Sequence, residues 1–100
     1  MATTTKTLYR GAAATSSATL YTVPASTTTV ITNIAVTNTA AAAATYTILL
    51  DGVVFASASS IAANDTIIID VKQVLATTKI IAGLASAVTV NFHICGVEIA

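Results

Sequence analysis

The sequence is poor in charged and aromatic residues, and this narrows the range of possible partners. Charged side chains make up 8% of the 100 residues and aromatic ones 5%, and tryptophan is absent. Average soluble domains carry about 25% charged residues. The Lys and Arg residues are scattered and balance the Asp and Glu residues, so the formal net charge is zero. Without a basic patch to neutralise phosphates, we expect no nucleic-acid partner.

Cysteine and histidine occur once each, which leaves little for catalysis or metal binding. Cys95 cannot form an intrachain disulfide, and we expect it to act as a small buried hydrophobic residue. His93 would share a strand face with Cys95, but a structural zinc site needs four ligands. The chain has no other candidate general base, no G-x-S-x-G motif and no glycine-rich phosphate loop. We therefore expect a protein that is not an enzyme and has no metal or cofactor.

Long apolar runs are missing, although hydrophobic residues make up 55% of the chain. Thr and Asn interrupt the uncharged stretch 11–50, so it holds no run of about 18 apolar residues that could cross a membrane. Residues 1–6 are polar and lack the apolar core of a signal peptide. We expect no membrane partner, and we interpret residues 1–6 as an N-terminal arm.

The chain is rich in short β-branched segments separated by turn residues. Asp51-Gly52 between two such segments is a strong hairpin signal. Strands are expected at residues 6–10, 18–23, 27–38, 45–50, 53–59, 66–71, 78–84 and 88–99. Short strands at this spacing predict an all-β fold, with about eight short antiparallel strands in a β-sandwich or jelly roll. Residues 7–100 would form this single domain.

Four local features are harder to place. The alanine-rich segment 39–44 is too short for a stable helix in water, so we expect a loop. Residues 71–76 could form one helical turn. Gly83 would break its strand, and a bulge at Gly96 would reverse the alternation of apolar residues in the last strand.

The strand at residues 27–38 is apolar on both faces. Val30, Ile34 and Val36 lie on one face, whereas Ile31 and Ala35 lie on the other. A thin core covers one face, and leaving the other in water forfeits about 25 cal/mol per Å² of apolar surface. We therefore expect a symmetric homo-oligomer, a trimer, that packs through this second face or through residues 66–71. The competing account is that both faces are covered within the domain, by the two sheets and by the turn at residues 71–76. The candidate contact residues are Ile31, Ala35, Ile67, Ile68, Ile69, Tyr9 and Lys6.

Six segments carry a resemblance over nearly the whole chain: TLYRG at 7–11, LYTVPA at 20–25, TNI at 32–34, LDGV at 50–53, DVKQVL at 70–75 and NFHICGVEI at 91–99. Together they resemble a family of small structural proteins of tailed bacteriophages. The resemblance implies a capsid decoration (cement) protein that binds major capsid subunits, often as a trimer. It implies a location on the virion, at the capsid surface more than the tail, after synthesis in the host cytoplasm.

Two alternatives stay open. The same resemblance also implies a head-fibre, tail-fibre or baseplate module that binds other virion proteins, a glycan or a receptor. A separate sugar-binding module would instead need exposed aromatic platforms, for which Tyr9, Tyr21 and Tyr46 are the candidates.

Overall fold

The computed structural model describes residues 3–100 and contains eight strands, all paired antiparallel. They are β1 (Thr3–Ala12), β2 (Ala18–Thr22), β3 (Thr28–Asn38), β4 (Ala44–Leu50), β5 (Val53–Ile61), β6 (Thr66–Leu75), β7 (Ile80–Ala85) and β8 (Val90–Ile99). The predicted all-β fold of about eight short antiparallel strands is confirmed. The described residues contain no helix, and so none that could span a membrane.

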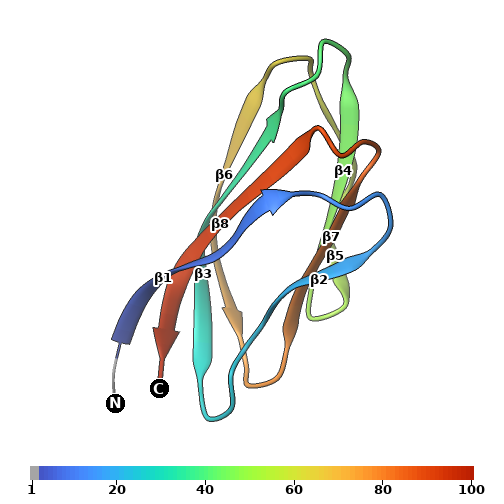
Figure 1. The fold of residues 1–100 in the computed structure, drawn as a ribbon. Coiled ribbons are helices and arrows are strands. Elements are labelled where there is room, and N and C mark those ends of the chain that lie inside the picture. Colours follow the sequence, from blue (N-terminus) through green and yellow to red (C-terminus); the bar gives the residue numbers. More distant parts are fainter. Residues whose placement is uncertain (1–2) are drawn as a thin grey trace.

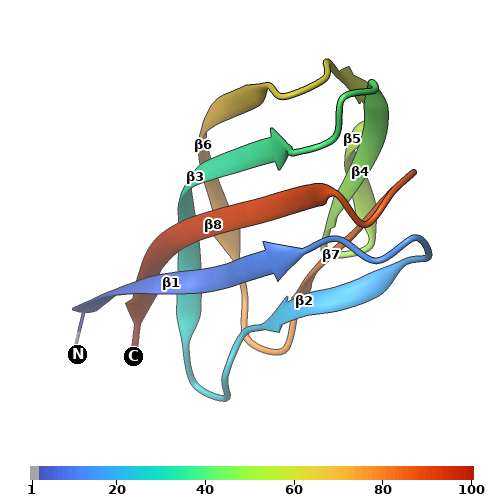
Figure 2. The same ribbon diagram turned by 45° about the horizontal axis from the view of Figure 1, so that its top comes forward.

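The strands form two four-stranded sheets, in the orders β1-β8-β3-β6 and β2-β7-β4-β5 (Figure 1). We call these the first and the second sheet. The order follows from one antiparallel ribbon, in which β4 pairs with β5, β3 with β6, β2 with β7 and β1 with β8. Rolling this ribbon places β3 beside β8 and β4 beside β7. This is the strand order of a jelly roll, and Figure 2 shows the first sheet face-on.

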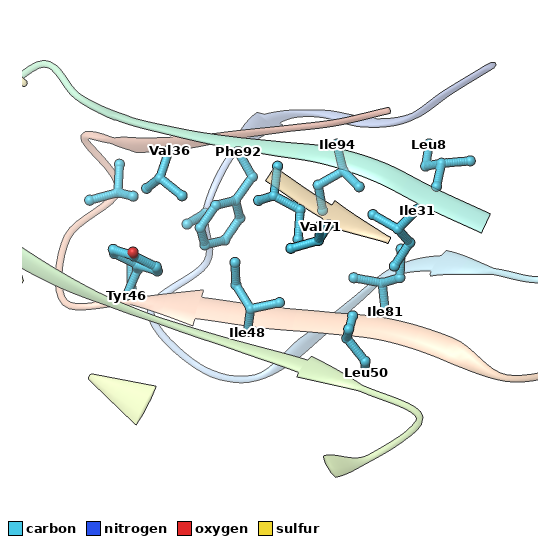
Figure 3. Packing of buried hydrophobic residues seen from close by; sticks show 14 of the residues in the cluster. Leu8, Ile31, Val36, Tyr46, Ile48, Leu50, Val71, Ile81, Phe92 and Ile94 are labelled. Carbon is cyan, nitrogen blue, oxygen red and sulfur yellow. The ribbon is translucent and has the colours of Figure 1, made fainter. Parts of the chain in front are cut away.

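The core lies between the inner faces of the two sheets (Figure 3). Phe92 from the first sheet meets Tyr46 from the second edge to face, with 6.4 Å between ring centroids and 73° between planes. Gly83 lies within β7, so the expected break there is wrong. A Cβ at Gly83 would stand 3.0 Å from Leu20 Cδ1 and 3.1 Å from Phe92 Cε2, so the glycine makes room for core side chains.

The first sheet is kinked along one row of residues. Leu8 in β1 is an extra residue opposite the Ile94–Cys95 step of β8, and Thr32 in β3 is an extra residue opposite the Cys95–Gly96 step. The bulges therefore lie in the strands beside β8, and the expected bulge at Gly96 is wrong. A Cβ at Gly96 would come within 2.4 Å of the Val30 carbonyl oxygen, so only glycine permits this close approach. The register pairs Glu98 of β8 with buried Thr29, so β8 keeps its alternation to its end.

The alanine-rich segment at residues 39–43 is a loop, as expected, and the fully buried Asn38 holds it in place. The Asn38 side-chain amide donates to the carbonyl oxygens of Ala42 (2.8 Å) and Ala62 (3.3 Å). Its oxygen accepts hydrogen bonds from the Ala40 backbone N–H and the Thr89 hydroxyl. This buried side chain, with all its polar atoms satisfied, adds to the backbone hydrogen bonds that Thr39 and Ala40 make with Thr89 and Asn64.

The Asp51-Gly52 turn, residues 71–76 and the start of the chain follow the expectations to different degrees. The hairpin at Asp51-Gly52 forms, with positive φ angles of 56° and 74° as a tight β-turn requires. The helical turn expected at residues 71–76 is wrong, because β6 continues to Leu75 in pairing with β3. Residues 3–6 of the expected N-terminal arm belong to β1 and pair with residues 96–99. Residues 1 and 2 of that arm lie outside the described residues.

Candidate interaction surface

Ile31, expected on a contact face, is fully buried in the core. The bulge at Thr32 explains this correction. Because β3 gains one residue there, Ile31 joins Ile34 and Val36 on the inner face. Alternation across the whole strand had placed Ile31 on the opposite face. Ile31 is therefore unavailable to any partner.

The other apolar candidates on β3 and β6 divide between the two faces of the first sheet. Ile67 and Ile69 are half-buried and pack against the core. Ile68 points outward and is 68% exposed, beside half-buried Ala35 in the neighbouring strand. Of the isoleucine run at 67–69, Ile68 alone offers a largely free apolar side chain.

Lys6 and Tyr9 lie in β1, at the opposite edge of the first sheet. Lys6 is exposed and its Nζ lies 3.2 Å from Glu98 Oε2. Tyr9 is half-buried against the core, and its hydroxyl donates to the Ala12 carbonyl oxygen at 2.9 Å. The sheet thus keeps these two residues apart from Ile68, and the candidate residues do not form one continuous patch.

A polar cluster lies at the end of the sandwich where the first residues of β1 pair with the last residues of β8. The Tyr21 hydroxyl donates to Glu98 and lies 2.9 Å from the Thr29 hydroxyl, which must then donate to Tyr21. The Tyr21 hydrogen bond, together with Lys6, holds the pKa of Glu98 below its ordinary value, although burial partly opposes this. Burial and the bond to Glu98 raise the pKa of Tyr21. Every member of this cluster has a partner, which fits a structural role.

A second apolar area, not predicted from the sequence, lies where the β4–β5 hairpin approaches β6. Val53 and Val54 are 68% and 53% exposed, and Val74 in β6 is 66% exposed. A shallow depression of about 210 Å³ lies here, lined by Leu50, Val53, Val54, Phe55 and Gln73. We call the exposed residues Val53 and Val54, beside Gln73 of β6, the β5–β6 surface; the exposed Ile68 and Val74 lie on the outer face of the first sheet. Two adjacent valines directly after the Asp51-Gly52 turn were the available sequence signal, since alternation buries only one of such a pair.

The outer face of the first sheet holds a larger open depression of about 500 Å³ at the kink. It is lined by Thr5, Lys6, Thr7, Thr32, Cys95, Gly96 and Val97. Cys95 is half-buried here, whereas the sequence analysis led us to expect a buried residue. His93 lies on the same outer face, opposite Ala35. Within residues 3–100, no group of three or more His, Cys, Asp or Glu side chains is placed to hold a metal ion.

Comparisons with known proteins bear on the fold. No protein-family model matches the sequence, and no curated protein matches it. One similar solved structure is a chain from the crystal structure of the T13 IBDV viral particle, with a TM-score of 0.56 and 13% sequence identity. The alignment covers 97% of this chain but 30% of the IBDV chain, so this protein spans less than a third of that chain's length. At this identity the likeness supports the fold, a jelly roll over nearly the whole chain.

Proposed function

We propose that this protein is a structural component of a virus particle, which decorates or cements a capsid by binding the major capsid subunits. The observation that carries the proposal is the jelly-roll order over almost the full chain, shared with part of a chain in a viral particle. The phage-like segments in the sequence point to the same role. No part of the proposal depends on a catalytic group.

The surface chemistry supports binding to another protein. A neutral chain with 8% charged residues has little electrostatic repulsion to overcome on association. The β5–β6 surface exposes Val53 and Val54, whose burial against a partner would be favourable. A small rigid body with such a face suits a protein that adds contacts between neighbouring capsid subunits.

The glycan-binding alternatives have less support, because no aromatic side chain within residues 3–100 is exposed. Tyr46 and Phe92 are buried in the core. Tyr9, Tyr21 and Phe55 are half-buried, and both half-buried tyrosine hydroxyls are engaged in hydrogen bonds. A fibre module that binds other virion proteins remains the second candidate, since it would use the same apolar face.

Two measurements test the proposal. Cryo-EM of particles from the virus that encodes the chain should show density for this jelly roll on the capsid surface; density confined to the tail would favour the fibre module. Purified protein should also co-sediment with empty capsids. Val54→Asp places a charge on the β5–β6 surface and should weaken that binding, whereas Ser57→Asp, exposed on the same strand, should not. Absence from purified particles would overturn the proposal.

A further inference from the structure

β6 has a free backbone edge at one side of the first sheet, and its use does not depend on the proposed virion role. β6 is the outermost strand of the first sheet and pairs only with β3, with one register shift where Val71 and Lys72 face Thr32. In the described part of the chain, no turn or loop backbone group hydrogen-bonds to residues 66–75. An edge strand of ten residues without proline leaves a row of N–H and C=O groups open to another strand.

The outward-facing side chains of β6 have an ordered sequence. Ile68, Asp70, Lys72 and Val74 all point away from the core, and the buried residues Val71 and Leu75 alternate with them. Asp70 and Lys72 form an ion pair of 3.2 Å, but their side chains are 83% and 75% exposed. Such an exposed pair contributes little to stability. Both charges are therefore free to exchange partners.

We propose that the protein forms a two-fold symmetric dimer in which β6 pairs antiparallel with β6 of a second copy, with Val71 opposite its own equivalent. In that register Asp70 lies opposite Lys72 of the second copy, and Lys72 opposite its Asp70. Ile68 lies opposite Val74 in the same way. The two most exposed apolar residues of β6 thus cover each other, and opposite charges meet across the ladder.

Other registers lack this complementarity. Outward residues must face outward residues, so a two-fold axis can centre on any single residue of the strand. Centring the axis on Asp70 places the two aspartates opposite each other, and centring it on Lys72 does the same for the lysines. Centring it on Ile69 places Asp70 opposite Ile68. Only the register centred on Val71 pairs both the charges and the exposed apolar residues.

The other edge strands are less suited to self-pairing. β1 carries Lys6 and Arg10 without an acidic residue that could face them across a two-fold axis. β2 has only five residues. β5 has two register shifts and a positive φ of 43° at Ala58, which distort its edge. A lysine on an edge strand commonly prevents pairing, but in β6 an aspartate two residues away turns it into a complementary contact.

A contact of this kind differs from the trimer expected from the sequence. β6 against β6 uses the same surface on both copies, which closes with two subunits. A three-fold assembly would need two different surfaces that fit each other. The described structure shows a self-complementary edge, and so we expect a dimer.

Sedimentation velocity of the full chain across the micromolar range tests the dimer. We expect a species of twice the 10.0 kDa monomer mass. Asp70→Lys and Lys72→Asp each convert two attractive pairs into repulsive ones and should weaken dimerisation about tenfold. Lys79→Asp makes the same charge change at an ion pair outside β6 and should leave the dimer unchanged.

Charge restoration gives the sharper result. The double variant Asp70→Lys/Lys72→Asp should dimerise as the unmodified chain does. An equimolar mixture of the two single variants should form mixed dimers, because one carries two positive and the other two negative side chains at these positions. Circular dichroism checks that each variant is folded. A monomeric or trimeric unmodified chain, a dimer insensitive to the single changes, or failure of both restorations would overturn the proposal.

Discussion

At the scale of single residues, polar side chains inside this small sandwich are held by complete sets of partners. Asn38 and Thr29 are fully buried, yet no side-chain nitrogen or oxygen that is buried in residues 3–100 lacks a hydrogen bond. Asn38 anchors the alanine-rich loop. Glu98 is the one acidic residue drawn inward, where Tyr21 and Lys6 satisfy it. Burying a polar group without such partners costs about 1–3 kcal/mol.

The Glu98 cluster predicts a loss of stability in acid. The pKa of Glu98 is lower in the folded chain than in the unfolded one, so the stability that it adds is fully present above the unfolded pKa, near ~4.3. That contribution is lost as the pH falls through the lower folded pKa. Urea unfolding should show Glu98→Gln less stable than the unmodified chain at pH 7, with the difference shrinking below about pH 4.

Tyr21→Phe is the companion variant for this prediction. It removes the hydroxyl that donates to Glu98 while keeping the ring, so the pKa of Glu98 should rise toward its ordinary value. The acid-dependent part of the stability should then be smaller than in the unmodified chain. An unfolding free energy whose pH dependence is the same in all three proteins would contradict the assigned cluster.

At the scale of elements, the kink across the first sheet decides which residues are core. The extra residues Leu8 and Thr32 lie in the two strands that flank β8, opposite its consecutive steps at residues 94–96. Together they bend the sheet and change which face β3 presents, so that Ile31 is buried. The Val30 carbonyl oxygen can lie this close to residue 96 only because that residue is a glycine.

Gly96→Ala should therefore be strongly destabilising. The added Cβ would lie 2.4 Å from the Val30 carbonyl oxygen and 2.9 Å from Leu8 Cδ1, and the backbone contact cannot be relieved by a rotamer change. We expect a loss of about 1–3 kcal/mol in the free energy of unfolding, measured by urea denaturation. Gly11→Ala is the control, because its Cβ would contact only the Tyr9 side chain, at 3.3 Å or more. A change within about 0.5 kcal/mol is expected there, and equal losses at both glycines would contradict the account.

At the scale of the whole molecule, the fold is one long antiparallel ribbon rolled into two sheets. The strand pairs are nested, from the β4–β5 hairpin outward to β1 and β8 at opposite ends of the chain. Every pair outside the hairpin joins strands that are distant in sequence, and closing such loops is entropically costly. The molecule is elongated, with extents of 46 × 21 × 18 Å.

This topology predicts slow folding. Proteins dominated by non-local β-pairing fold in milliseconds to seconds, and stopped-flow refolding should give rates in that range. We expect the β4–β5 hairpin to form early, since it is the one local pair. Gly52→Ala, at a φ of 74°, should then slow folding more than it speeds unfolding. A chain that refolds in microseconds, or a Gly52→Ala effect confined to unfolding, would contradict this view.

Alternation and turn chemistry are local properties, so the amino-acid pattern alone predicted the all-β class, the approximate strand positions and the Asp51-Gly52 hairpin. It could not determine which face of β3 is buried, because that depends on bulges set by pairing with β8. Nor could it show that Gly83 and Gly96 serve close packing. The free edge of β6 and the exposed pair Ile68 and Val74 were likewise decided only by the rolled topology, since strand order is a property of distant segments.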